Sequence, residues 1–378
     1  MKKLFIFGFA ALLLVAFTAP AMAKVKMGGI IFTDFYYLDR DKNNAGSTEP
    51  LTNTRIEVPG ITRLNGRWTN EDNVGMFIEF GLGGALGATD TSLRHAYGWW
   101  DVSPMFTLMA GHSTTPFSQL NPSQLLGTNS GSLNIIGLGY GDFYSGRFPQ
   151  VRGTFRFGKV ARLEIALVDP SGGNAGPWPA TAQNNSKLPR VDIAVPLHFG
   201  PVRLYPGFLV QQKSVDLAPA GVDDSITTYI GTIGAKAGFG PFGIAAEGNW
   251  GKNVGNTRMG MGNSPSTGTI ASATLLNTNQ IHDAETFSFW IDASFKFGPA
   301  TPHLMYGLQE SKNQTAAGAN TECRTQMIGI SVPISLAKGF SIRPEFMWYD
   351  DGDIKTSGSA SVDNGKYSIY GVQFQITF

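Results

Sequence analysis

The sequence predicts an all-β fold, an antiparallel transmembrane β-barrel of about sixteen strands. Three observations carry this prediction: an alternating strand at the carboxy terminus, a leader segment at the amino terminus, and a composition poor in charge. Going back from Phe378, every second residue of the last strand is bulky and apolar: Ile376, Phe374, Val372 and Tyr370. Successive side chains of a strand point to opposite faces, so this segment has one apolar face and one largely polar face. Taken alone, the pattern also fits the last strand of a soluble sandwich.

The amino terminus has the layout of a secretory signal peptide. Lys2 and Lys3 precede an uncharged, mostly apolar run over residues 4–18, and Ala-Met-Ala at 21–23 is a small-residue cleavage site. We therefore predict a signal peptide over 1–23 and a mature β-barrel over 24–378. The apolar run is too short for a retained membrane helix, and no later stretch has 18 consecutive apolar residues.

Composition supports a chain that faces lipid rather than water. Charged residues make up 15% of the sequence, against about 25% in typical soluble domains. Without the leader, 27 basic residues face 28 acidic ones, a net charge of −1 that excludes nucleic acid as an electrostatic partner. The single cysteine, Cys323, allows no internal disulfide and no paired-cysteine metal or haem site.

Strand-like runs follow one another along the whole mature chain. We expect sixteen, at 25–38, 58–69, 74–83, 93–102, 105–112, 150–157, 161–168, 188–199, 202–213, 225–239, 242–252, 286–297, 303–311, 325–336, 341–349 and 366–378. Most have the roughly 9–11 residues of a tilted membrane strand. Short connections alternate with long ones, the long ones being 39–57, 113–149, 169–187, 253–285 and 350–365. Tight turns on one side and long loops on the other are typical of outer-membrane barrels.

A Phe-Gly pair ends four of these runs at a short turn, at Phe157, Phe199, Phe239 and Phe297. Aromatic rings at one fixed depth predict an interfacial girdle, because an amphipathic ring rests at the headgroup boundary. The alternative is that a Phe-Gly pair only closes a hairpin turn. That explanation suits a single turn better than four turns with the same pair.

The layout of the mature chain resembles the general bacterial porin family. Besides the last strand, the resemblance rests on residues 93–115, an Arg-x-x-Tyr strand from Arg94, a tight turn, and a strand ending in Gly before the 113–149 connection. It implies a water-filled, sixteen-stranded channel for small hydrophilic solutes in the outer membrane of a Gram-negative bacterium, surrounded by lipid and usually a homotrimer. The family folds its third loop, here 113–149, into the barrel. This loop departs from the enteric P-E-F-G-G motif, having P-F-S-Q-L-N-P-S-Q-L-L-G at 116–127.

Strand parity predicts which charged residues face the lumen. A charge on the lipid face near the bilayer midplane costs about 2–4 kcal/mol for Arg or Lys, so inward placement is favoured. The expected pore-lining and selectivity residues are Arg63, Arg67, Arg152, Arg156, Lys236, Lys296, Glu79 and Asp292. Asp142 is the one acid expected on the constriction loop. The parity of the 93–102 strand stays ambiguous, since Trp99 and Trp100 cannot both face lipid, so either Arg94 or His95 faces inward.

These residues suggest weak anion preference or none. Rings of charged side chains select ions, but Arg and Glu on neighbouring strands could also simply pair. A substrate-selective porin for anions or sugars is an alternative, because Tyr205, Trp290 and Tyr349 have inward parity. A docking barrel with a plugged lumen is a third, although no plug domain precedes the first strand.

Catalytic and metal-dependent functions find little support. The five histidines show no metal-ligand spacing such as H-E-x-x-H, and no G-x-S-x-G elbow occurs. His112-Ser113 is the nearest approach to the outer-membrane phospholipases and lacks their surrounding pattern. We expect no enzyme activity, no cofactor and no metal.

Overall fold

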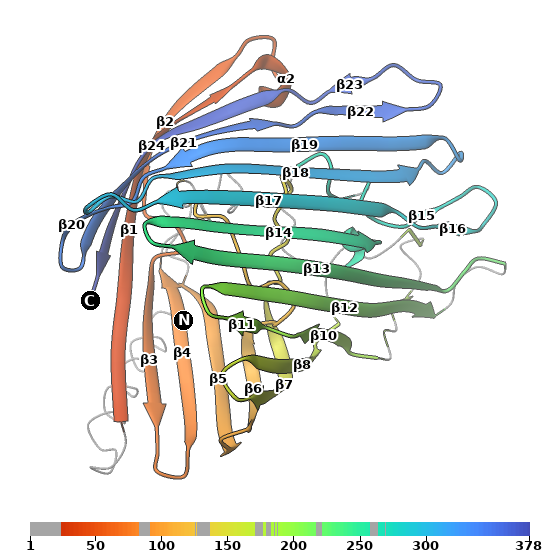
Figure 1. Cartoon of the computed structure of the whole chain (residues 1–378). Helices are drawn as coiled ribbons and strands as arrows, with labels where there is room; N and C mark the ends of the chain where they lie inside the picture. Colours follow the sequence, from red (N-terminus) through yellow and green to blue (C-terminus); the bar gives the residue numbers. More distant parts are fainter. Residues whose placement is uncertain are drawn as a thin grey trace, which may run out of the picture.

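The computed structural model describes residues 24–82, 91–124, 126, 137–170, 177–178, 183–184, 186, 188–216, 221–257, 264–268 and 270–378. The predicted signal peptide, 1–23, lies outside these residues. Within them, sixteen wall strands form one closed antiparallel sheet (Figure 1). Among the described residues, no helix has both the length and the apolar content to cross a membrane.

The wall strands follow chain order around the barrel. They are β1 (Lys24–Arg40), β2 (Leu51–Glu57) continued by β3 (Arg63–Thr69), β4 (Val74–Leu82), β5 (Thr91–Ser103), β6 (Phe106–Thr114), β7 (Arg147–Phe157), β8 (Ala161–Val168), β10 (Arg190–Ala194) continued by β11 (Leu197–Phe199), β12 (Val202–Asp216), β13 (Ser225–Phe239), β14 (Phe242–Lys252), β17 (Glu285–Phe295), β18 (His303–Gln314), β19 (Asn320–Ser331) continued by β20 (Ile334–Ala337), β21 (Phe340–Asp350) and β24 (Lys366–Thr377). The long connections add α2 (Lys42–Ala45), β9 (Gln183–Asn184), η1 (Val254–Asn256), β15 (Thr274–Leu275), β16 (Ile281–His282), β22 (Asp353–Thr356) and β23 (Val362–Asp363).

The first and last strands close the barrel. β1 and β24 pair antiparallel from Ile30–Thr377 to Arg40–Tyr367, and Figure 1 shows them side by side. Closure of the barrel pairs the two sheet edges with each other. A backbone exposed to lipid requires this, because its N–H and C=O groups cannot bond to water there. The predicted all-β barrel and its count of sixteen strands are therefore confirmed.

Three predicted strands are interrupted at prolines, one of them the strand expected at 325–336, where Val332 and Pro333 separate β19 from β20. The strand expected at 58–69 begins only at Arg63, as β3, because Pro59 has no N–H for the ladder. In the gap, the Thr62 hydroxyl accepts from the Phe32 amide at 3.0 Å and replaces a backbone pairing. β2 also occupies residues expected in the 39–57 loop. The strand expected at 188–199 is β10 and β11, separated at Val195 and Pro196.

The short turns bear out the Phe-Gly pattern with one shift. β7, β11 and β13 end at Phe157, Phe199 and Phe239, and each following glycine has φ near +60°. β17 ends two residues early at Phe295, and Phe297 instead bridges to Ala300. All four Phe side chains are more than half exposed, as a girdle requires.

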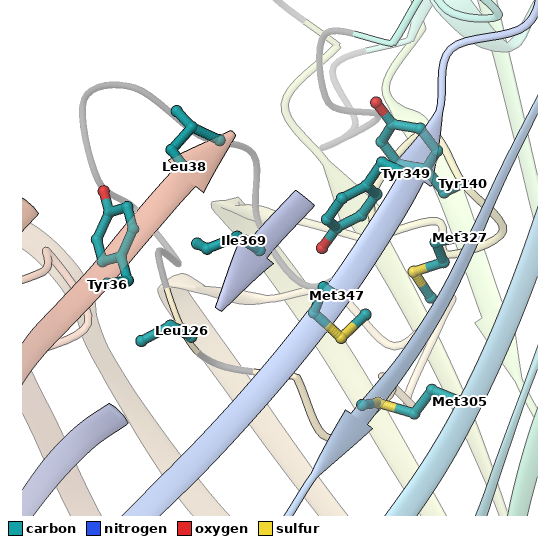
Figure 2. Packing of buried hydrophobic residues seen from close by; sticks show 9 residues of the cluster. All are labelled: Tyr36, Leu38, Leu126, Tyr140, Met305, Met327, Met347, Tyr349 and Ile369. Atoms are coloured by element: carbon teal, nitrogen blue, oxygen red, sulfur yellow. The ribbon is translucent and has the colours of Figure 1, made fainter. Parts of the chain in front are cut away.

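Side chains alternate along the wall between an exposed apolar face and a buried, mostly polar face. In β17, Phe287, Ile291 and Phe295 are exposed, whereas Ser288 and Asp292 are buried. We call these the outer and inner faces. The largest apolar cluster lies on the inner face and joins β1, β18, β19, β21 and β24 to Leu126 and Tyr140 of the β6–β7 connection (Figure 2).

Candidate functional site

Arginines gather on the inner face of β3 to β10. Arg63 and Arg67 come from β3, and Arg152 and Arg156 from β7. Four more belong to the same wall: Arg94 of β5, Arg147 at the start of β7, Arg162 of β8 and Arg190 of β10.

A β-bulge resolves the ambiguous strand. The register between β4 and β5 shifts between Glu79 and Phe80. The extra residue lets both Arg94 and His95 approach Glu79, at 2.8 and 4.0 Å. Beyond the bulge Trp99 is buried on the inner face, while Trp100 is half exposed on the outer face.

Each inner carboxylate of this wall lies beside an arginine. Glu79 contacts Arg94 at 2.8 Å and Arg63 at 3.6 Å. Glu164 contacts Arg162 at 2.6 Å and Arg152 at 3.5 Å. These pairs are what simple charge neutralisation between neighbouring strands predicts.

The pairing does not cancel the positive charge. The guanidinium of Arg67 lies 4.4 Å from the ring centroid of Trp99, a cation–π contact, and forms no ion pair within the described part of the chain. Arg156 is 4.0 Å from Asp101, and both side chains are about 40% exposed, so water weakens that pair.

A cavity of about 540 Å³ runs along this wall. Its charged lining residues are Arg67, Arg152, Arg156, Arg162, Asp101 and Glu164, four positive and two negative. Tyr97, Trp99 and Tyr144 add aromatic surface. Arg67, Arg152 and Arg156 thus lie together, whereas Lys236 and Lys296 are exposed near the short turns and do not line this cavity.

The β6–β7 segment, defined as residues 115–124, 126 and 137–146, contacts the inner face of the opposite wall. The Ser123 amide donates to Asp292 at 2.9 Å, and the Leu126 amide donates to Glu345 of β21 at 2.6 Å. The Ser118 hydroxyl donates to Glu247 of β14 at 3.1 Å. Asp292 therefore holds this segment and does not line the cavity described above.

Two wall glycines let the segment lie against the strands. A Cβ on Gly307 of β18 would lie 2.1 Å from the carbonyl oxygen of Tyr140, and one on Gly207 of β12 would lie 2.3 Å from that of Phe117. Any larger residue at either position would collide with the backbone of the segment.

Asp142, the acid expected on the constriction loop, points away from the arginines. Its side chain is fully buried against β14 and β17. Burial first, and then the charge of Glu247, raise the pKa of Asp142 well above its ordinary value.

A second connection, the expected loop at 253–285, also contacts the inner face. The β14–β17 segment, residues 264–268 and 270–273, is largely buried. The Ser266 carbonyl accepts from Ser311 at 2.6 Å and Gln309 at 3.2 Å, and the Ser264 hydroxyl donates to the Gly139 carbonyl at 2.8 Å. The two segments thus pack on each other and on β17 to β19.

No protein-family model matches the chain, and no curated protein matches it in sequence. Solved structures do. The outer membrane channel DcaP of Acinetobacter baumannii superposes with a TM-score of 0.71 at 17% identity, over 95% of this chain and 99% of that one. An anion-selective porin from Comamonas acidovorans gives 0.60 at 15% identity, over 94% and 100%. OmpF of Salmonella typhi in complex with daunomycin gives 0.60 at 12%, over 94% and 98%.

The chain has the fold of outer-membrane porins. At these identities the likeness concerns the fold, and the solute must be argued from the residues of this chain.

In this porin fold, the aromatic residues suggested as a solute track, Tyr205, Trp290 and Tyr349, do not line the cavity. Trp290 is fully buried, and Tyr349 is 4% exposed. The ring of Tyr349 lies 4.8 Å from that of Tyr140 and stacks on Tyr367 at 4.6 Å. Tyr205 is half-buried on β12 and outside the cavity lining.

The side chains of His95 and Ser113 lie together as a general base and a nucleophile would, but the hydrogen bond between them runs in the wrong direction for that role. Arg147 Nε, which can only donate, lies 3.2 Å from His95 Nε2, so Nε2 accepts. His95 Nδ1 then carries the hydrogen and donates to Ser113 Oγ at 3.2 Å. In this tautomer the imidazole cannot take the serine proton, as a nucleophilic mechanism requires. Among the described residues, no three His, Cys, Asp or Glu side chains form a metal-ligand group.

Asp351 ties three long connections together at the end of the barrel away from the short turns. Its carboxylate accepts from the Tyr140 hydroxyl and from Asn44 Nδ2, the latter at 2.6 Å. Burial, followed by the neighbouring charge of Asp350, raises the pKa of Asp351 from 3.8 to about 6.

We expect this contact to make stability depend on pH. The folded protein binds a proton at Asp351 near pH 6, which the unfolded chain binds only near pH 4, so stability should rise as pH falls through this interval, by up to about 3 kcal/mol. Asp351→Asn should remove that part of the rise in Tm between pH 7 and pH 5. Asp224→Asn, in an exposed loop, is the control and should keep it; an identical pH dependence in both variants would contradict the assignment.

Proposed function

We propose that the protein is an outer-membrane channel for passive diffusion of small hydrophilic solutes, with a preference for anions. The observation that carries the proposal is the charge of the cavity along β3 to β8, where four arginines face two carboxylates. Sixteen strands enclose enough space for an aqueous lumen, whereas eight leave room for side chains alone.

The two inner segments define the passage. In our proposal the β6–β7 segment acts as the constriction loop, and the β14–β17 segment supports it from behind. The β6–β7 segment is bound to β14, β17 and β21, and the β14–β17 segment to β18. The side of the lumen lined by Arg67, Arg152 and Arg156 is therefore open to the solute. Solutes therefore pass along the basic wall, and anions are attracted there.

A solute-selective porin is the second candidate. Tyr97, Trp99 and Tyr144 share the cavity with the arginines, so an anion with apolar surface would contact both. Such a solute should block ion conductance in a saturable way, whereas a general diffusion pore should show no saturation.

Location, assembly and the lack of catalysis complete the proposal. We infer export by the 1–23 leader, insertion in the outer membrane of a Gram-negative bacterium, a homotrimer, and likeness to the general porin family. The fold of the solved relatives supports this. The His95 tautomer supports a non-enzymatic role. A docking barrel with a closed lumen is disfavoured by the open basic cavity.

Liposome swelling tests the proposal. Vesicles containing the purified protein should swell in isotonic solutions of small sugars and amino acids, at rates that fall as solute size increases. At equal size, anionic solutes should enter faster than cationic ones. Vesicles that do not swell with any solute would contradict the channel function and favour a docking barrel.

A further inference from the structure

A row of polar side chains crosses the basic cavity from β5 to β8. Cross-strand register places four of its lining residues side by side: Asp101, Thr107, Thr154 and Glu164. Two of the lining arginines stand on either side of this row, because Arg152 and Arg156 are two residues from Thr154 on the same face of β7. A hydroxyl and two guanidinium groups therefore line the same part of the cavity.

Most hydrogen-bond donors of these three side chains remain available to a solute. Besides the ion pair described above, Arg156 donates to Thr107 Oγ1 at 2.8 Å. Arg152, beside its own ion pair, donates to the Thr114 carbonyl at 3.5 Å. Within the described residues, the Thr154 hydroxyl has no hydrogen-bond partner. A guanidinium presents its N–H groups as a fork that binds two oxygens of one oxyanion, so this part of the cavity suits an oxyanion.

The charge of the cavity matches that of a phosphate monoester. Its lining has four positive and two negative side chains, which leaves a formal charge of +2. A phosphate monoester carries about −1.5 to −2 at pH 7 and has three acceptor oxygens. A carboxylate carries a single charge and two oxygens, so it would leave part of the donors unused. Phosphate therefore fits the arginines of this cavity better than carboxylate does.

The aromatic rings of the cavity are mostly engaged with other side chains. The guanidinium of Arg67 covers the ring of Trp99 at 4.4 Å, and Trp99 is 9% exposed. The ring of Tyr144 faces Arg147 at 5.5 Å. The ring of Tyr97 packs on that of Trp99, with 6.0 Å between their centroids. An apolar solute would find little free aromatic surface here.

Groups that bind hydroxyls are free instead. The Tyr97 hydroxyl and the Asn121 amide both line the cavity, and neither forms a hydrogen bond within the described part of the chain. The side chain of Asp101 is 42% exposed and can accept further hydrogen bonds. Because sugar hydroxyls both donate and accept, a sugar would satisfy all three groups, whereas the ring of an aromatic anion would satisfy none of them.

We propose that this cavity is a binding site for phosphorylated sugars, with the phosphate at Thr154 between Arg152 and Arg156. The sugar hydroxyls bind to Tyr97 and Asn121. The inference rests on the anion passage proposed above and adds the class of solute. A solute that binds on its way through makes the passage saturable, which a general diffusion pore is not.

Block of the ion current tests the site. With the purified protein in a planar bilayer, glucose 6-phosphate should reduce the KCl conductance in a saturable way. Its half-blocking concentration should be about tenfold lower than that of phenyl phosphate, which has the same phosphate but no hydroxyls to bind. An equal or lower value for phenyl phosphate would overturn the proposal in favour of an apolar anion. Normal conductance without saturable block by glucose 6-phosphate would also overturn it and leave the diffusion channel in place, whereas the absence of conductance would contradict the channel itself.

Variants assign the two halves of the site. Arg156→Gln should raise the half-blocking concentrations of glucose 6-phosphate and of inorganic phosphate alike, about tenfold, because a charge-assisted fork is lost. Tyr97→Phe should raise that of glucose 6-phosphate about threefold and leave that of inorganic phosphate unchanged, because only a hydroxyl is lost. Thr227→Val, at an exposed residue of β13 outside the cavity lining, is the control and should behave as the wild type does. Unchanged block by glucose 6-phosphate in both Arg156→Gln and Tyr97→Phe would overturn the proposal.

Discussion

Replacing Arg67 and Arg156 by glutamate should convert the channel from anion preference to cation preference. Both arginines line the cavity, and neither is a close partner of a buried carboxylate. The charged lining would change from four positive and two negative residues to two positive and four negative. A unit charge 4–8 Å from a permeating ion changes its energy by about 0.5–1 kcal/mol in water, so two reversals should change the anion-to-cation permeability ratio about tenfold or more.

The measurement is the zero-current potential of the variant in a salt gradient across a planar bilayer. Lys159→Glu with Lys338→Glu is the matched control, because it makes the same change of net charge at exposed turn residues. The control should keep the sign of the wild type. If the control reversed the sign and the Arg67/Arg156 variant did not, the passage would not follow the basic wall.

Gly307→Ala should narrow the channel without unfolding the barrel. A Cβ at this position would lie 2.1 Å from the Tyr140 carbonyl oxygen, and overpacking of this kind costs about 1–3 kcal/mol. The strand is held by its ladder on both sides, so the β6–β7 segment should move away from the wall instead. The displaced segment would approach the arginine wall, so single-channel conductance should decrease.

Gly248→Ala provides the control. Gly248 lies on β14, and a Cβ there would meet no atom within 4 Å. This variant should conduct as the wild type does. Unchanged conductance in Gly307→Ala would mean that the segment does not set the width of the passage.

Much of the fold followed from patterns within single strands. The predicted bounds 225–239 and 242–252 coincide with β13 and β14, since both strands have continuous two-residue periodicity and a Phe-Gly turn between them. The failures are local. Pro59 interrupts a ladder that periodicity alone extends, and the bulge at Glu79 turns Arg94 and His95 to the same face, which a strict two-residue period forbids.

The candidate site was predictable where strand parity decides it. Arg67, Arg152 and Arg156 line the cavity, and their role as pore-lining residues stays a prediction. Arg162 and Arg190 share the parity of Glu164 and Asp192, so the same signal would have found them. Parity shows the face of a residue but not what covers that face. Asp292, Trp290 and Tyr349 do point inward, yet the β6–β7 segment covers Asp292 and Tyr349 through contacts with Ser123 and Tyr140, more than 150 positions away. No pattern in the 253–285 connection marks its own contact with the inner face.

The zero-current potential of the wild-type channel shows whether ions pass along the basic wall. With the purified protein in a planar bilayer and a tenfold KCl gradient, we expect a stable conductance and a potential whose sign shows chloride crossing more readily than potassium. A potential of the opposite sign would contradict the basic passage, and the absence of conductance would contradict the channel itself.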